Sequence, residues 1–136
     1  MAIYSVPGKM EGIWREDIKA VVDTWADYFV TLDEFKEAVL GKGVPYAKAH
    51  GAVAWIVDSS KAKGVFSQEI QDFIGSDIFP NFANNGIKYF ITITSTVSAV
   101  TKMNVSTYAA KAGPHGLQLL ELNSVADAEM WLKTNA

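Results

Sequence analysis

An uninterrupted apolar run, residues 52–57, is the feature that most constrains the fold of this chain. The run stops abruptly at Asp58, Ser59 and Ser60. An apolar run of this length that ends in a polar turn is typical of a strand buried on both faces in the middle of a parallel sheet. Ligands and partners of open α/β sheets usually bind at loops that leave the carboxyl ends of central strands. The stretch 58–67 is therefore the first candidate for function.

The composition indicates one globular domain over residues 1–136. Hydrophobic residues make up 49% of the chain and charged residues 20%, which is typical of a folded protein rather than a disordered one. A chain of 136 residues is long enough to bury a core without covalent staples. The formal net charge is -3, from 12 Lys and Arg against 15 Asp and Glu, so we expect no nucleic-acid partner.

The absence of cysteine excludes disulfides, thiolate metal sites and a catalytic thiol. The amino-terminal residues contain no apolar stretch of signal-peptide length. No run approaches the roughly 18 apolar residues of a membrane span. We therefore expect a cytoplasmic protein without a transmembrane segment.

Capping signals predict where the helices begin. Residues 31–34, Thr-Leu-Asp-Glu, form a full capping box, so a helix begins there, and the glycines and proline of residues 41–45 are expected to break or kink it. Ser67 is the predicted cap of a second helix, which residues 75–77 are expected to break. A weaker pattern predicts a third helix near residues 97–108, and Ser124 opens the last one.

Strands are predicted at both ends of the chain as well as at its centre. Residues 18–25 show a weak period-two alternation, in which Ile18, Ala20 and Val22 share one face, and this is typical of an antiparallel or edge strand. The other predicted strands are residues 2–6, 87–94 and 117–122. The resulting order predicts an α/β domain with a mixed, mostly parallel sheet of about five strands and about four helices.

This order of elements resembles the STAS domains of the anti-sigma-factor antagonist type, and more closely the SpoIIAA-like branch that is grouped with CRAL-TRIO lipid-binding folds. The residues that carry the resemblance are Trp25 and residues 31–35, 55–58, 66–69, 78–80 and 128–132. The resemblance implies a STAS (SpoIIAA-like) topology and a regulatory, partner-binding role.

The resemblance also implies a candidate phosphoacceptor. In the anti-sigma-factor antagonists, the regulatory serine lies in an Asp-Ser-Ser-Gly context at the start of the helix after the central strand. Ser67 matches that serine by position, although Phe66 precedes it. The residues Asp58-Ser59-Ser60 look like the motif but lie earlier, and Lys61 stands where glycine would follow.

Polar residues at the expected carboxyl edge are the candidate ligand- or partner-binding residues. Each has a structural alternative: Asp58 builds a local turn, Ser67 caps a helix, and Lys61 is solvated. The full set is Asp58, Ser59, Ser60, Lys61, Ser67, Ser95 and Thr96.

No motif predicts catalysis, a metal or a cofactor. The two histidines, His50 and His115, lack the ligand spacing of a zinc site, and His50 suits a helix carboxyl terminus. The sequence has no Gly-x-Ser-x-Gly elbow, Gly-x-Gly-x-x-Gly fingerprint or Walker loop. We therefore expect no catalytic residue, no metal and no cofactor.

Three functional hypotheses remain at the sequence level. The first is a non-enzymatic regulatory or binding domain that binds a partner protein or a small ligand, with an anion as one candidate, at residues 58–67 and 95–98. The second is a carrier of an apolar or lipid-like ligand, held between the helices and the sheet. The third is a small enzyme of unknown reaction that combines Asp58 with Ser67, Ser95 or His115. A homodimer, paired through an edge strand or an exposed helix, stays open in each case.

Overall fold

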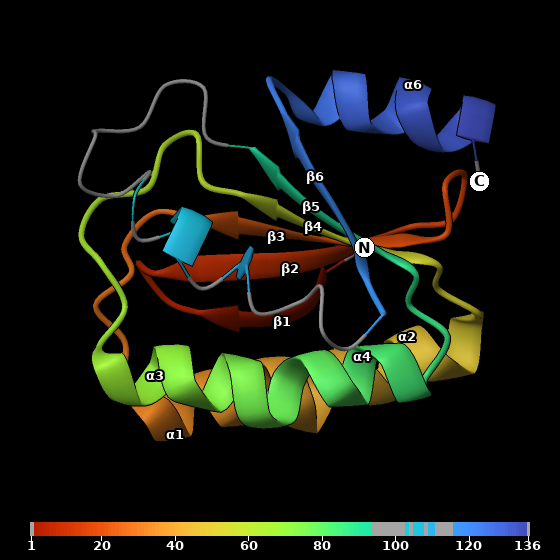
Figure 1. Cartoon of the computed structure of the whole chain (residues 1–136). Helices are drawn as coiled ribbons and strands as arrows, with labels where there is room; N and C mark the ends of the chain where they lie inside the picture. The colour runs from red at the N-terminus through yellow and green to blue at the C-terminus, as the bar shows by residue number, and fades with distance from the viewer. Residues whose placement is uncertain (1, 94–102, 104, 108, 111–115, 136) are drawn as a thin grey trace.

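The computed structural model describes residues 2–93, 103, 105–107, 109–110 and 116–135, which form a layered α/β domain (Figure 1). Six strands form one sheet in the order of the chain, β1-β2-β3-β4-β5-β6. The first three strands are antiparallel neighbours, whereas β3, β4, β5 and β6 run parallel to one another. The strands are β1 (Ala2–Val6), β2 (Met10–Arg15), β3 (Ala20–Trp25), β4 (Ala54–Asp58), β5 (Tyr89–Ile93) and β6 (Gln118–Leu122). The predicted mixed, mostly parallel α/β fold is confirmed.

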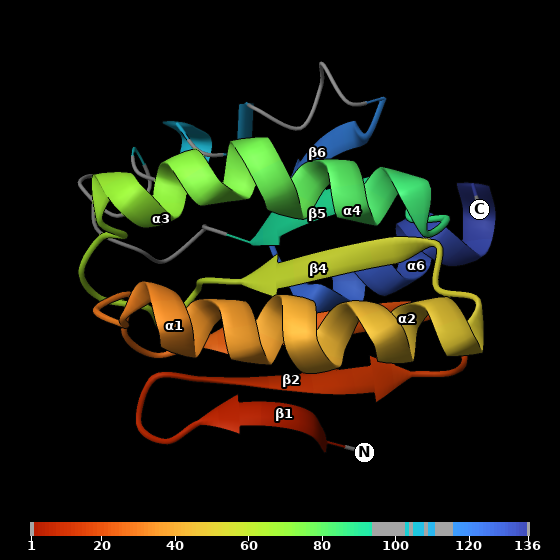
Figure 2. The ribbon, with the colours of Figure 1, turned by 90° about the horizontal axis from the view of Figure 1, so that it is seen from below.

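Two long helical runs cover one face of this sheet, side by side (Figure 2). The first run is α1 (Leu32–Phe35), the π-helical segment η1 (Lys36–Gly43) and α2 (Val44–His50); the second is α3 (Gln68–Phe73), the π-helical segment η2 (Ile74–Ile78) and α4 (Phe79–Asn84). The helix α6 (Val125–Asn135) covers the opposite face (Figure 1). Among the described residues, no helix has the length and apolar character needed to cross a membrane.

The central strand β4 divides the core into two layers. Its side chains alternate between the layers: Trp55 and Val57 join the aromatic core beneath the two helical runs, and Ala54 and Ile56 join the aliphatic core beneath α6. All four side chains are buried, as the apolar run predicts.

The strand β2 was not predicted, because Gly12 suggests a turn rather than a strand interior. Met10, Gly12 and Trp14 instead form its buried face. Residues 18–25 were predicted as an antiparallel or edge strand: the antiparallel pairing is confirmed with β2, and the edge position is wrong, since β3 lies between β2 and β4. Val21 and Val22 are therefore both buried, on opposite faces.

The capping predictions are confirmed, and neither helical run is broken where a break was predicted. The Glu34 N–H donates to the Thr31 hydroxyl at 3.1 Å, and the Glu34 carboxylate accepts from the Thr31 N–H at 2.8 Å. Both helical runs then continue through the expected breaks as wide π-helical turns. Gly43 does not end the helix; its lack of a side chain lets the helix pack closely on the sheet, because a Cβ at this position would lie 2.7 Å from the Trp55 ring. The second run continues through residues 75–77, where Ile74 and Ile78 anchor it in the core.

Candidate functional site

The carboxyl end of β4 closes into a local turn. One Asp58 carboxylate oxygen accepts from the Ser60 N–H at 3.0 Å and from the Ser60 hydroxyl at 2.6 Å. Ser59 points the other way: it is fully buried, and its hydroxyl is hydrogen-bonded to the hydroxyl of Tyr28. Asp58 and Ser60 therefore shape the start of the loop, and Ser59 ties that loop to the core.

The loop after β4 lies beside the loop that follows β3. The Tyr28 N–H donates to the Lys63 carbonyl at 3.0 Å, and the Lys63 N–H donates to the Ala26 carbonyl at 3.1 Å. The side chains of Lys61 and Lys63 remain exposed. Two loops far apart in the sequence thus form one surface at the carboxyl edge, which we call the loop edge (residues 26–31 and 58–67).

An aromatic side chain stands out from the loop edge. Phe29 is 63% exposed, yet its N–H donates to the Asp27 carboxylate at 2.9 Å, and Lys9 donates to the other oxygen of that carboxylate at 3.0 Å. The Phe29 N–H and the Lys9 ammonium hold the pKa of Asp27 below its usual range. Gly64 has a φ of +77°, and a Cβ there would lie 2.8 Å from the Phe29 ring. The backbone of Phe29 is therefore held in place although its ring faces solvent.

Ser67 begins α3 as predicted. Its hydroxyl accepts from the Ile70 N–H at 3.2 Å, and the residue is exposed. Asp58 and Ser67 are not hydrogen-bonded to each other, since each bonds within its own turn. Three further candidates of the sequence analysis lie outside the described residues: Ser95, Thr96 and His115.

His50 occupies the last turn of α2, as expected from the sequence. Its Nδ1 lies 2.9 Å from the Tyr46 carbonyl oxygen, and its ring stacks on the Tyr46 ring with centroids 3.9 Å apart. Within the described part of the chain, no group of three or more His, Cys, Asp or Glu side chains is placed to hold a metal ion.

The structure places one carboxylate deep in the core, where the sequence analysis had no candidate. Asp23 on β3 is 3% exposed and faces the aromatic layer beneath the helical runs. One of its oxygens accepts from the hydroxyl of Tyr4 on β1, and the other accepts from Trp55 Nε1 on β4 at 2.8 Å. These hydrogen bonds link three strands of the sheet through one side chain.

Two glycines make room for this cluster. Gly12 lies on β2, between β1 and β3, and a Cβ there would overlap the Tyr4 ring. Gly43 ends η1 above the sheet, and a Cβ there would lie 2.8 Å from the Tyr4 ring as well as 2.7 Å from the Trp55 ring. The Tyr4 side chain therefore reaches Asp23 through space that any other residue at these positions would fill.

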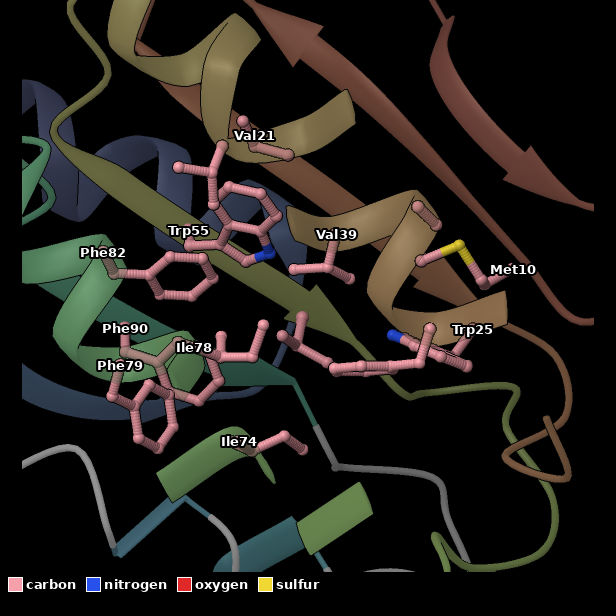
Figure 3. Close-up of a cluster of buried hydrophobic side chains, with 14 of the residues drawn as sticks. Met10, Val21, Trp25, Val39, Trp55, Ile74, Ile78, Phe79, Phe82 and Phe90 are labelled. Carbon is pink, nitrogen blue, oxygen red and sulfur yellow. The ribbon is translucent and has the colours of Figure 1, made fainter. Parts of the chain in front are cut away.

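Asp23 also borders a narrow cavity between the sheet and the two helical runs. The cavity leaves about 20 Å³ for the centre of a water-sized sphere, which is room for about one water molecule. Figure 3 shows the aromatic and aliphatic side chains that surround it. Apart from Asp23, its lining is apolar: Trp25, Phe35, Val39, Trp55, Val57, Phe66, Ile74, Ile78, Phe79, Phe82 and Phe90.

Burial is the main influence on the titration of this cluster. It raises the pKa of Asp23 from 3.8 to about 7, although the hydrogen bonds from Tyr4 and Trp55 oppose the shift. Burial, followed by the nearby Asp23 charge, also raises the pKa of Tyr4 well above its usual value. Tyr4 therefore keeps its proton throughout the range in which Asp23 titrates.

Sequence reasoning missed Asp23 because the alternation of β3 groups it with Lys19, which is exposed. The available signal was its setting: a lone carboxylate follows Val21 and Val22 and precedes Trp25 on a strand whose other residues, apart from Thr24, are apolar. A charged residue in such a stretch is rarely buried without partners.

No family model, curated protein or solved structure matches this chain.

Proposed function

We propose that this chain is a non-enzymatic binding domain that recognises a partner protein at the loop edge. The observation that carries the proposal is the exposed ring of Phe29, whose backbone is held by Asp27. Aromatic residues, phenylalanine among them, are enriched at the cores of protein interfaces relative to the rest of the protein surface. A residue whose backbone is held in place before binding also loses less conformational freedom when a partner covers it.

The surroundings of Phe29 suit the rim of such an interface. Lys61 and Lys63 are exposed on the neighbouring loop, where they would select for acidic groups on the partner and speed its association. The carboxyl edge of a mostly parallel sheet is also where α/β domains usually bind their ligands. Aromatic and cationic groups together favour a partner surface that is apolar at its centre and acidic at its margin.

The resemblance to SpoIIAA-like STAS proteins supports a regulatory partner and makes Ser67 the proposed phosphoacceptor. Its hydroxyl caps α3 from the solvent side, where phosphate would meet the positive helix terminus and Glu69 would oppose it. The proposed surface would also include Ser95 and Thr96.

The alternative function, a carrier of an apolar ligand, requires the two helical runs to separate, because the cavity between them has room for about one water molecule.

Site-directed photocrosslinking in the host cell tests the proposal. A photoreactive phenylalanine analogue is placed at position 29, and a matched control places it at position 130, because Met130 is 71% exposed on α6 across the sheet. We expect one adduct of defined mass from position 29 that position 130 does not give. An adduct of twice the chain mass would identify a second copy as the partner.

The captured protein is then purified and its affinity measured directly. We expect Phe29→Ala to weaken binding by about tenfold or more, and Met130→Ala to leave it unchanged. Equal adducts from both positions, or equal affinities of both alanine variants, would contradict the proposal.

A further inference from the structure

The carboxylate of Asp23 is an unusual group to find in this core. It lies in an apolar layer, and its hydrogen-bond donors are two neutral groups, the Tyr4 hydroxyl and the Trp55 indole. Burying a carboxylate without a cation carries a large desolvation cost. In this core the protonated form of the carboxyl group is therefore more stable than the ionised form.

The charged and titratable groups around Asp23 do not supply a counter-ion among the described residues. On β1, Tyr4 is the titratable side chain that contacts it. The residue opposite it on β2 is Gly12, and its neighbours on β4 are Val57 and Trp55, none of which carries a charge. The second helical run presents only apolar side chains to the cavity. On the first run, the charged residues Glu34, Glu37 and Lys42 line a separate hollow, which Tyr4 also borders but Asp23 does not.

The three neighbours of Asp23 are not held equally. Trp55 lies on the central strand β4, which has strands on both sides, and its ring stacks on Phe82 with centroids 4.3 Å apart. Tyr4 lies on β1, which is an edge strand with β2 as its one neighbour in the sheet. The pairing of β1 with β2 is also irregular between Ala2 and Tyr4. We therefore expect that separating β1 from β2 is the opening that brings water to Asp23 at the lowest free-energy cost.

We propose that Asp23 is a proton-controlled latch: with its proton the carboxyl group stays buried beneath Tyr4 and the edge strand β1 stays closed, whereas the ionised group favours an opening of β1, because water solvates the charge better than the closed core does even with the Tyr4 and Trp55 hydrogen bonds in place. Release would uncover the space beneath Tyr4 and the adjoining end of η1, where Gly43 packs against the same ring. The latch is independent of the loop edge, because it lies inside the sheet and uses none of the residues proposed to contact a partner.

The size of the effect follows from the two protonation equilibria. The pKa of Asp23 is about 7 in the closed protein, and we take the usual value of 3.8 for the opened state. The equilibrium constant for opening then rises by roughly 30-fold between about pH 5.5 and about pH 8.5.

Native-state hydrogen exchange of the whole chain tests the latch. After correction for the intrinsic pH dependence of exchange, we expect the protection of β1 amides to fall by roughly 30-fold between about pH 5.5 and about pH 8.5. The fall should persist at low denaturant without depending on its concentration, which marks local opening. Asp23→Asn should abolish it, and Asp72→Asn, which removes an exposed carboxylate of α3, should leave it intact.

Three results would overturn the proposal. They are pH-independent protection of β1, the same pH response in Asp23→Asn, and exchange of β1 through global unfolding alone. If Asp23→Asn does not fold, carbon NMR of the Asp23 carboxyl group in the unmodified protein decides. A midpoint near 7 that coincides with the change in β1 protection supports the latch, and a midpoint near the usual value of 3.8 rejects it.

Discussion

The Tyr4 hydroxyl on the edge strand reaches across β2 to donate to the carboxylate of Asp23 on β3. The ring that carries this hydroxyl lies over Gly12, where β2 has no side chain. A cross-sheet contact of this kind depends on a residue that takes no part in the hydrogen bond. The buried cluster is thus built by packing as much as by polar chemistry.

The role of Gly12 predicts a large effect of a small substitution. We expect Gly12→Ala to destabilise the protein by about 1–3 kcal/mol, because the new Cβ overlaps the Tyr4 ring and forces it to move. Gly41→Ala is the matched control: its Cβ would meet its nearest neighbour at an ordinary 3.7 Å, and alanine favours helix by up to about 1 kcal/mol. Chemical denaturation measures both, and equal effects would contradict the role of Gly12.

The raised pKa of Asp23 predicts that the protein loses stability as pH rises. Below about pH 4 the carboxyl group is protonated in both folded and unfolded chains, so it contributes no pH dependence there. Between about pH 4 and pH 7 the unfolded chain releases the proton while the folded protein retains it, and each pH unit lowers the free energy of unfolding by about 1.4 kcal/mol. The loss reaches at most roughly 4 kcal/mol and levels off above about pH 7.

Denaturation of Asp23→Asn over the same range isolates this contribution. The variant has no carboxyl group to titrate at position 23, so the difference in slope between the two proteins belongs to Asp23. We expect the variant to lack the decline between about pH 4 and pH 7. Parallel curves for the two proteins would show that Asp23 titrates at an ordinary pKa.

The sequence predicted the central strand and the helix caps because their signals are local. The buried run before Asp58 and the capping oxygens of Thr31 and Ser67 each act within a few residues, so the pattern and the structure agree. The loop that follows β4 was also placed correctly, but the exposure of Phe29 depends on how the loop after β3 lies against it. That relationship is tertiary and leaves no periodic signal.

The Asp23 cluster was not predictable for the same reason. Tyr4 precedes Asp23 by 19 residues, and Trp55 follows it by 32 residues, so neither hydrogen bond has a local signature. The glycines that admit Tyr4 also resemble turn or break signals when read along the chain. Gly12 and Gly43 owe their places to close packing, which emerges only when the strands and helices are assembled.

The cap of α3 predicts a modest stability effect at the proposed phosphoacceptor. Ser67→Ala removes the oxygen that accepts from Ile70, and we expect a loss of about 1 kcal/mol. Ser67→Asp retains an acceptor at the cap and should restore most of that stability. Thermal or chemical denaturation compares the three proteins. An alanine variant as stable as the parent would show that the cap contributes little.

Phosphorylation of Ser67 is a separate prediction with its own measurement. Mass spectrometry of the protein isolated from its host, during activity of the cognate kinase, should find phosphate on the peptide that contains Ser67. Persistent absence of phosphate there would remove the phosphoswitch and leave Ser67 as a helix cap.

The hydrogen bond from Tyr4 predicts how a single hydroxyl tunes the buried acid. That bond lowers the pKa of Asp23 against the larger effect of burial. Tyr4→Phe keeps the ring over Gly12 but removes the donor, so ionised Asp23 loses one of its two partners and its pKa should rise above about 7. Carbon NMR of the Asp23 carboxyl group measures the midpoint, and Trp55→Phe should shift it in the same direction. A midpoint that stays in place or falls in Tyr4→Phe would mean that Tyr4 does not stabilise the carboxylate.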